Sequence, residues 1–349
     1  MHFYRRIPMK AKPILVLAVL FVFSAPAMAE ISSFPVVVNT NGKANPVTNG
    51  NVVVYGEVKT NWQLYAYNLA DSTGALVSEN AGNERISIYD DTLVYCKQNR
   101  VYGYNLYGGT EYRISAEESS QYSPRVGGET VVWVDGRNGN WDIYSLDITS
   151  GIESAVSVDF STQTNPDTNG KVVVWYDDRN GNWDIYSYDA STGVELQICG
   201  DSAMQISPVI SGDIVVWRDS RNGDYEIRGY NLADGEEFSI SGTTADWHPH
   251  AIDGNIVVWT DTRNGNDDIY GYDLLSGTEF PICTAAGNQM NPDISGNLVV
   301  WEDYRNGVGD IYGAIVPEPS TWTLLTIGVL AVLVIFIVRD QMLHSRRKR

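Results

Sequence analysis

Val-Val-Trp triplets recur along the chain at a constant spacing. They end at Trp133, Trp175, Trp217, Trp259 and Trp301, and each of these residues lies 42 positions after the one before it. Two weaker copies, centred on Tyr55 and Tyr95, precede them, which makes seven repeats of about 41 residues. A period of this length is typical of the four-stranded blades of β-propellers.

Each complete repeat contains the same series of strand and turn patterns. A segment with a proline, at Pro124, Pro166, Pro208 or Pro292, is followed by a glycine, the Val-Val-Trp run, an Asp-x-Arg-Asn-Gly turn and two further strands. The Val-Val-Trp runs are apolar at consecutive positions, so both faces of these strands are expected to be buried between neighbouring sheets. The pattern predicts an all-β fold over residues 30–316, a seven-bladed β-propeller of four-stranded blades.

The two ends of this domain complement each other. The last repeat stops after Asp310-Ile311-Tyr312 and lacks an outer strand, whereas the domain begins with an additional strand pattern at Phe34 to Val38. We therefore predict that the N-terminal strand completes the last blade and closes the ring.

Residues 1–29 have the three parts of a secretory signal peptide. Basic Arg5, Arg6, Lys10 and Lys12 precede an apolar run, and Ala27-Met28-Ala29 ends the segment with small residues at its first and third places. This order predicts cleavage by signal peptidase after Ala29 and export of the mature chain.

Residues 317–349 form a second terminal segment. An uncharged run at 322–338 is just long enough for a transmembrane helix, and the basic tail that follows predicts a cytoplasmic C-terminus. The simplest interpretation is a membrane anchor. Together with the preceding Pro317, Glu318 and Pro319, however, the segment resembles the PEP-CTERM sorting signal of bacterial envelope proteins. The resemblance implies processing by an exosortase, in bacteria that make extracellular polysaccharide.

The repeated sequence itself resembles the propellers of TolB-type translocation proteins and of archaeal surface-layer proteins. The Trp-x-Asp-x-Arg-Asn-Gly and Asp-Ile-Tyr segments carry this resemblance over about residues 34–315. It implies a propeller, but these relatives share no common chemistry.

The charge of the domain limits its partners. The chain has a formal net charge of -19, and nine of its 24 Lys and Arg residues lie in the two terminal segments, so the domain is more acidic than the chain as a whole. Such a surface repels phosphate backbones, which argues against nucleic acid as a partner. Three cysteines without a CxxC or Cys/His cluster suggest neither a disulfide framework nor a zinc site.

The Asp-x-Arg-Asn-Gly turn brings charged residues together. A two-residue type I′ loop at Asn138-Gly139 would pair Arg137 with Asn140, Asp135 with Asp142, and Trp133 with Tyr144. Arg137 would then neutralise both carboxylates, which makes the cluster part of the scaffold. Equivalent clusters are Asp177, Arg179 and Asp184, and Asp261, Arg263 and Asp268. The alternative is a calcium loop, although an arginine at the third position would place a cation where a ligand is needed.

A ligand site is expected where the repeats differ on a common framework. Twelve residues before the aromatic residue, five repeats have Gln121, Gln163, Gln205, Trp247 and Gln289, and the two weaker copies have Lys43 and Asn83. We predict that these side chains form a ring at one mouth of the central channel, suited to glycan or peptide recognition. The alternative is that they satisfy backbone groups between the blades.

The sixth repeat differs most, with His248 and His250 flanking a proline. Two histidines two positions apart on an extended segment point to one face and could hold a metal, but no third ligand is evident. The alternative is two solvated loop histidines, and we predict no metal site and no catalytic residues.

These observations predict an exported, non-catalytic propeller of the cell envelope or extracellular matrix, membrane-anchored at least before processing. Its expected partners are a polysaccharide or an envelope protein, and no cofactor is predicted apart from the calcium alternative. Two other functions stay open, a glycan-active lyase or hydrolase and a purely structural surface-layer protein.

Overall fold

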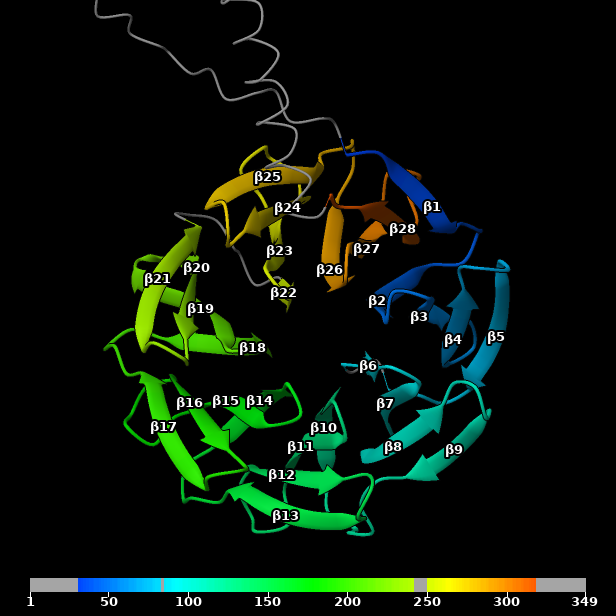
Figure 1. Ribbon diagram of the computed structural model, residues 1–349. Coiled ribbons are helices and arrows are strands. Elements are labelled where there is room, and N and C mark those ends of the chain that lie inside the picture. The colour runs from blue at the N-terminus through cyan, green and yellow to red at the C-terminus, as the bar shows by residue number, and fades with distance from the viewer. Residues whose placement is uncertain (1–30, 83–84, 242–249, 318–349) are drawn as a thin grey trace, which may run out of the picture.

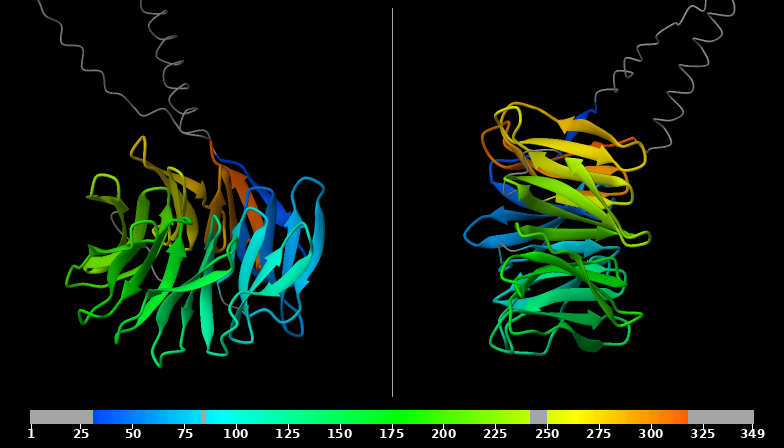
Figure 2. Two further views of the ribbon diagram at one scale, coloured as in Figure 1. Left: turned by 60° about the horizontal axis from the view of Figure 1, so that its bottom comes forward. Right: turned by 90° about the vertical axis from the view of Figure 1, so that its left-hand side faces the viewer.

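Seven four-stranded antiparallel sheets stand around a central axis (Figure 1) in the computed structural model, which describes residues 31–82, 85–241 and 250–317. Seen from the side, neighbouring sheets stand next to each other around the ring (Figure 2). The all-β, seven-bladed propeller with four-stranded blades is therefore confirmed.

The blades are numbered here in chain order, and within each blade the first strand is innermost (Figure 1). Blade 1 contains β2 (Lys43–Thr48), β3 (Val52–Val58), β4 (Trp62–Asn68) and β5 (Thr73–Ser78). Blade 2 contains β6 (Ser87–Tyr89), β7 (Thr92–Lys97), β8 (Arg100–Asn105) and β9 (Thr110–Arg113). Blade 3 contains β10 (Gln121–Gly127), β11 (Thr130–Asp135), β12 (Asp142–Asp147) and β13 (Ile152–Ser157). Blade 4 contains β14 (Gln163–Thr168), β15 (Val172–Asp177), β16 (Asp184–Asp189) and β17 (Val194–Cys199).

The remaining three blades follow the same order. Blade 5 contains β18 (Gln205–Ser211), β19 (Ile214–Asn222), β20 (Asp224–Asn231) and β21 (Glu236–Ser241). Blade 6 contains β22 (His250–Asp253), β23 (Ile256–Asp261), β24 (Asp268–Asp273) and β25 (Thr278–Cys283). Blade 7 contains β26 (Gln289–Ser295), β27 (Leu298–Asp303) and β28 (Asp310–Ile315), and its fourth strand is the N-terminal β1 (Ser33–Val37).

The ring is closed by the N-terminal strand, as the sequence predicts. β1 pairs antiparallel with β28, with Phe34 opposite Gly313 and Pro35 opposite Tyr312. The closing blade therefore combines strands from the two ends of the domain, so that the first and last blades cannot separate without breaking a sheet.

The core lies between the blades, around the repeated tryptophan. Trp133 is completely buried and packs against Val94 and Val101 of blade 2, while its ring stacks on Tyr144 with 6.4 Å between the ring centroids. The tryptophans of the other four complete repeats are also fully buried. Each blade is thus held by an apolar face against its neighbour, which explains why the Val-Val-Trp strands are apolar at consecutive positions.

The hairpin after each tryptophan has the predicted pairing but a different turn. Trp133 lies opposite Tyr144 and Asp135 opposite Asp142, as expected. The prediction of a two-residue type I′ loop is wrong. Such a loop needs a positive φ at both Asn138 and Gly139, but of these two only Gly139 has one, and its N–H donates to the carbonyl of Gly136. The connection therefore spans residues 136–141, and the predicted pairing of Arg137 with Asn140 does not form.

The arginine in this turn neutralises one carboxylate rather than two. Arg137 forms ion pairs of 2.6 Å with Asp135 and with Glu153 of β13. The opposite carboxylate of Asp142 instead accepts hydrogen bonds from the side-chain amides of Asn138 and Asn140. The same division holds for Arg179 with Asp177, next to Asp184, and for Arg263 with Asp261, next to Asp268.

The pKa values of the two carboxylates reflect this difference. Burial alone would raise the pKa of Asp135, but hydrogen bonds from Arg137, Ser119 and Trp133 outweigh it and lower the pKa. Burial raises the pKa of Asp142, since its amide donors carry no charge. The prediction that one arginine serves both carboxylates is therefore wrong, although the cluster does belong to the scaffold between strands.

The two terminal segments lie outside the described residues. This applies to the predicted signal peptide at 1–29 and, apart from Pro317, to the sorting segment with Glu318, Pro319 and the transmembrane helix at 322–338. Within the part of the chain that the structure describes, no helix has the length and hydropathy needed to span a membrane.

The ion pair of the turn gives a test of the scaffold. Asp177 is fully buried, and Arg179 pairs with it at 2.5 Å, so Arg179→Ala should strand a buried charge and lower the free energy of unfolding by about 2–4 kcal/mol. Lys171→Ala is the control, because this exposed lysine lies 3.4 Å from Asp189 and should change stability by less than about 0.5 kcal/mol. Denaturant unfolding with and without calcium makes the measurement. Equal losses in the two variants, or strong stabilisation of the wild type by calcium, would contradict the ion-pair interpretation.

Candidate functional site

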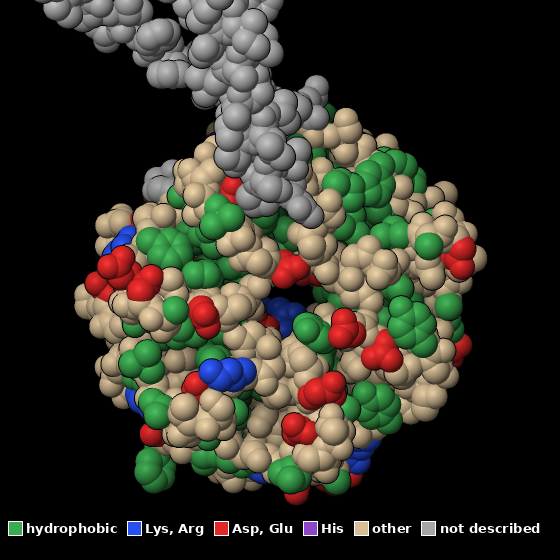
Figure 3. Space-filling view, in the orientation of Figure 1, with side chains coloured by type: hydrophobic (Ala, Val, Ile, Leu, Met, Phe, Trp, Pro, Cys, Tyr) green, Lys and Arg blue, Asp and Glu red, His purple; other side chains and the backbone are tan. Residues whose placement is uncertain are grey.

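The first strands of all seven blades surround a cavity of about 630 Å³ on the propeller axis. We refer to it as the axial cavity. It is lined by residues 45–49, 85–90, 125–127, 167–169, 209–212, 250–253 and 291–295, one segment from each blade. Looking down the axis, Figure 3 shows its opening, with Lys or Arg side chains at the bottom and acidic side chains around it.

One ring of lining residues, six positions before the aromatic residue of each repeat, joins adjacent blades. The side chain of Asn49 donates to the carbonyl of Asp90, and that of Asn169 donates to the carbonyl of Gly212. In the other direction, the N–H of Gly254 donates to Ser211 Oγ at 3.0 Å, and the N–H of Gly296 donates to Asp253 Oδ2 at 2.6 Å. These hydrogen bonds hold a polar rim at one end of the axial cavity.

A second ring, two positions earlier in each repeat, differs most from blade to blade. It contains Val47, Ser87, Arg125, Asp167, Val209, Ala251 and Asp293. Asp167 Oδ2 accepts the N–H of Ile210, and Asp293 Oδ2 accepts the N–H of Thr48, so both carboxylates also hold the next blade. The charged members of this ring make the axial cavity chemically asymmetric.

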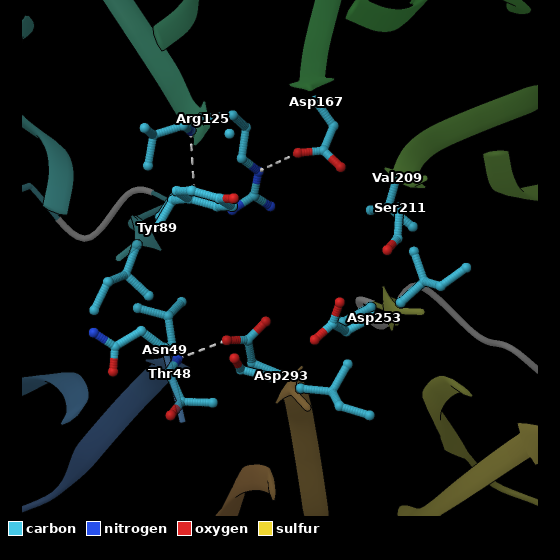
Figure 4. Close-up of a pocket in the computed structure, with 18 of the residues that line it drawn as sticks. Thr48, Asn49, Tyr89, Arg125, Asp167, Val209, Ser211, Asp253 and Asp293 are labelled. Carbon is cyan, nitrogen blue, oxygen red and sulfur yellow. Dashed lines mark hydrogen bonds and ion pairs between the residues drawn. The ribbon is translucent and has the colours of Figure 1, made fainter. Parts of the chain in front are cut away.

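Arginines dominate one side of the axial cavity. Arg125 donates from Nη1 to the carbonyl of Ile86 at 3.0 Å, and its Nε lies 3.8 Å from Asp167 Oδ1, too far for a hydrogen bond. Arg85 lines the same region, and burial together with the nearby Arg125 guanidinium lowers the pKa of Arg85 to about 10. In the close-up, Asp253 and Asp293 lie across the cavity from Arg125 and Asp167 (Figure 4).

Burial changes the titration of the lining acids. It raises the pKa of Asp167, and it raises the pKa of Asp293 to about 6, although the N–H of Thr48 and the charge of Arg125 oppose the shift. Asp293 therefore changes its charge near neutral pH, at a position where a ligand would contact it.

His250 is the only residue of the predicted sixth-repeat site that the structure describes, and it is buried. Its Nε2 lies 3.4 Å from the carbonyl of Val216, and burial lowers the pKa of His250 to about 3, so the ring is neutral at physiological pH. Trp247 and His248 lie outside the described residues. Within residues 31–82, 85–241 and 250–317, no three metal-ligating side chains come together.

The predicted glutamine ring does not form the mouth of the channel. Gln121, Gln163, Gln205 and Gln289 begin the innermost strands but are at most 1% exposed, and none of them lines the axial cavity. Three of them donate to backbone carbonyls two residues earlier, and Gln121 donates to Asp135 Oδ2 at 3.1 Å. Lys43, at the same position of the first repeat, reaches Asp310 of blade 7. These side chains satisfy polar groups between blades, which was the alternative interpretation.

Sequence reasoning missed the charged lining residues Arg85, Arg125, Asp167 and Asp293. A signal was present for Arg125, Asp167 and Asp293, because the position eight residues before the aromatic residue varies between apolar, basic and acidic side chains while its neighbours repeat. Arg85 lies ten residues before Tyr95 and is not part of this pattern. This is the variation on a common framework that a ligand site requires.

No protein-family model matches the chain, and no curated protein matches it. Among solved structures it resembles an oligogalacturonate lyase in complex with manganese, with a TM-score of 0.62 and 14% identity over 84% of this chain and 100% of that one. It resembles the β-propeller domain of the Trilobed protease from Pyrococcus furiosus, with a TM-score of 0.61 and 16% identity over 79% and 96% of the two chains. TolB from Acinetobacter baumannii is similar with a TM-score of 0.50 and 16% identity over 66% and 62%. At these identities the similarities show the fold alone, so the likeness to TolB-type propellers is confirmed for the fold.

The raised pKa of Asp293 predicts a pH-dependent stability. An aspartate with a pKa of 3.8 in the unfolded chain and about 6 in the folded chain binds more protons when folded, so stability decreases as pH rises from about 4 to 6. Asp293→Asn keeps an acceptor for Thr48 and removes this loss. We expect the variant to be more stable than the wild type by about 1–2 kcal/mol at pH 7.5 and equal to it near pH 4.

Asp147 supplies a control of opposite sign. The backbone N–H of Ser150 lowers the pKa of this exposed aspartate, so Asp147→Asn should be less stable than the wild type at pH 7.5, with a difference that disappears in acid. Chemical unfolding of the three proteins across this pH range makes the comparison. An Asp293→Asn variant that is less stable at pH 7.5 would contradict the assignment.

Proposed function

We propose that this protein is an exported envelope propeller that binds polysaccharide in its axial cavity without catalysing a reaction. The observation that carries the proposal is the lining itself, because seven strands direct hydrogen-bonding side chains of both donor and acceptor type into one cavity. Its volume of about 630 Å³ is within the range of small-molecule sites and suits a short stretch of sugar units.

The chemistry of the lining fits sugars better than apolar ligands. Asn49, Ser211 and Asp253 offer acceptors and donors at the rim, and Tyr89 adds an aromatic ring that is 45% exposed. A sugar presents hydroxyl groups at its edge and an apolar face, which matches polar side chains around one aromatic platform. The binding residues are therefore those that line the axial cavity, and the buried glutamines are not among them.

The envelope location rests on the sequence of the two terminal segments. A signal peptide would export the domain, and a PEP-CTERM-like segment would hold it at the membrane until an exosortase processes it. Localisation in bacteria that make extracellular polysaccharide would place the axial cavity next to the proposed ligand.

A glycan-active enzyme is the second candidate function. Two observations favour it: a fold neighbour is an oligogalacturonate lyase, and Asp293, with a pKa of about 6, could transfer a proton near neutral pH. The two functions differ in outcome, since a lyase or hydrolase consumes the bound oligosaccharide and a binding protein returns it intact.

Tyr89 gives the test of the binding site. A glycan array probed with the full-length chain identifies a bound oligosaccharide, and calorimetry then compares variants on that oligosaccharide. Tyr89→Ala should weaken binding about tenfold, because it removes the aromatic platform of the cavity.

Two controls separate the cavity from other surfaces. Tyr107→Ala removes a tyrosine of the same blade that is 79% exposed away from the cavity lining, and it should bind normally. Gln163→Ala should lower the melting temperature without a specific effect on affinity, since Gln163 is buried. Absence of any glycan binding would favour an envelope-protein partner or a structural layer, and shortened oligosaccharides in the calorimeter cell would favour the enzyme.

Glu318 gives the test of the sorting segment. Glu318→Ala leaves the apolar run at 322–338 unchanged, so membrane insertion should persist while exosortase processing and release are blocked. Cell fractionation followed by detection of both forms makes the measurement. If wild type and variant were distributed identically between the membrane and released fractions, the segment would be a simple membrane anchor.

A further inference from the structure

The axial cavity carries a local excess of positive charge on one side, in a domain that is acidic overall. Arg85 and Arg125 line it on neighbouring blades 2 and 3, and Arg218 of β19 in blade 5 is buried, with its guanidinium 4.4 Å from the centre of the Tyr225 ring. The arginines are close enough that Arg125 and Arg218 both disfavour the charge of Arg85. A protein gains nothing in stability from such like charges, so their placement favours a bound anion.

The carboxylates on this side do not balance the arginines. Asp167 is the one carboxylate of the described residues within 4 Å of Arg125, and its Oδ2 already accepts the N–H of Ile210. Arg125 Nε is buried and has no hydrogen-bond acceptor among the described residues. Within the described ranges no carboxylate lies close enough to form an ion pair with Arg85, although the charge of Asp167 acts on it from a greater distance. The Nε group of Arg125 is out of reach of a ligand, but Nη2 of Arg125 makes no hydrogen bond to the described residues, so Arg85 and this end of Arg125 are able to donate to a ligand.

The opposite side of the axial cavity offers acceptors. Asp253 and Asp293 each use Oδ2 to hold the next blade, which leaves Oδ1 of each for ligand hydroxyl groups. Figure 4 shows both carboxylates across the cavity from Arg125. A ligand that fits both sides carries an anionic group at one end and hydroxyl groups at the other.

We propose that the axial cavity binds an acidic sugar, with the carboxylate of a uronic acid on Arg85 and Arg125 and its hydroxyl groups on Asp253 and Asp293. The two oxygens of a planar carboxylate can accept the two parallel N–H groups of a guanidinium. A neutral sugar has no such pair of charged acceptors. The inference rests on the proposed function, since it names the class of polysaccharide that the cavity takes.

The acidic outer surface does not prevent this interaction. At physiological ionic strength the field of an exposed charge decays within about 8 Å, so the carboxylates of the outer surface are largely screened. Inside the cavity the arginines are only partly exposed, Arg125 at 19% of its side chain, and their hydrogen bonds with a ligand are screened less. Short-range contacts therefore decide the affinity, while the surface charge mainly slows the approach of a polyanion.

The test compares three trimers on the full-length protein by calorimetry: trigalacturonate, neutral trigalactose and a sulfated trigalactose. The wild type should bind trigalacturonate at least tenfold more tightly than the neutral trimer. Arg125→Gln should weaken trigalacturonate binding about 10–100-fold and change neutral binding less than threefold, because it removes the charged fork but retains a polar side chain.

Further variants keep the test informative if Arg125→Gln is unstable. Arg85→Gln removes a guanidinium without an ion-pair partner among the described residues, so it strands no carboxylate and should show the same selective loss. Arg113→Gln is the matched control, since Arg113 pairs with Glu118 on the surface of blade 2 and should leave both affinities unchanged.

The outcomes separate the inference from the proposed function. Equal binding of the three trimers, lost on Tyr89→Ala, would overturn the acidic-sugar assignment and leave polysaccharide binding intact. Equal binding of the sulfated and carboxylated trimers would overturn the uronic acid in favour of a general anion site. Failure of every trimer and of the glycan array would overturn both.

Discussion

The structure depends on the buried N–H group of the repeated indole. In all five complete repeats, Nε1 of the fully buried tryptophan donates to the aspartate two residues later, as in Trp133 to Asp135 at 3.0 Å. A buried N–H without an acceptor costs about 1–3 kcal/mol, and a carboxylate as acceptor introduces a buried charge that needs a cation. Arg137 supplies that cation. Its guanidinium also lies 3.8 Å from the centre of the ring of Tyr144, the residue opposite Trp133 in the hairpin. The tryptophan, aspartate and arginine therefore recur together.

This chain of contacts divides each blade into a fixed part and a variable part. The arginine also pairs with a glutamate of the fourth strand in blades 3 to 6, so the contacts join the second and fourth strands of each of these blades. In blades 3, 4 and 6 its guanidinium also lies over a tyrosine ring of the third strand. The positions of the innermost strand that face the axial cavity make none of these contacts between tryptophan, aspartate, arginine and glutamate. Those positions hold Arg125, Asp167 or Val209 in different blades without changing the fold. Chemical variety at the axis is compatible with a constant scaffold.

Features set by residue spacing could be predicted from the sequence, whereas features set by competition between side chains could not. The number of blades, the closure by Phe34 to Val38 and the opposition of Asp135 and Asp142 all result from a repeat of 42 residues and the hairpin between the strands. The hydrogen-bond partners of Asp142 do not follow from the spacing. Asn138 and Asn140 of the turn donate to its carboxylate, while Arg137 takes Glu153 as its second partner. In the first repeat Glu57 and Lys59 replace the aspartate and the arginine, and these residues lie 3.5 Å apart, so the opposite charges stay together.

Sequence reasoning assigned the lining of the central channel to the wrong repeat position because of one irregularity in the innermost strands. Gln163 pairs with Asp177, but Asp167 pairs with Val174, so the register shifts by one residue between them. The shift occurs at Asn165, which has a φ of 49°, and blades 1, 3, 5 and 7 have an Asn or Ser with positive φ at the same place.

Without that β-bulge, strict alternation would put Gln163 and Asp167 on one face of the strand. With it, Gln163 joins the face that carries Trp175, between two blades, and Asp167 takes the other face, where it lines the axial cavity. An Asn or Ser before proline gives little warning of this, since the residue before a proline is normally extended. The bulge therefore decides which repeat position becomes core and which can contact a ligand.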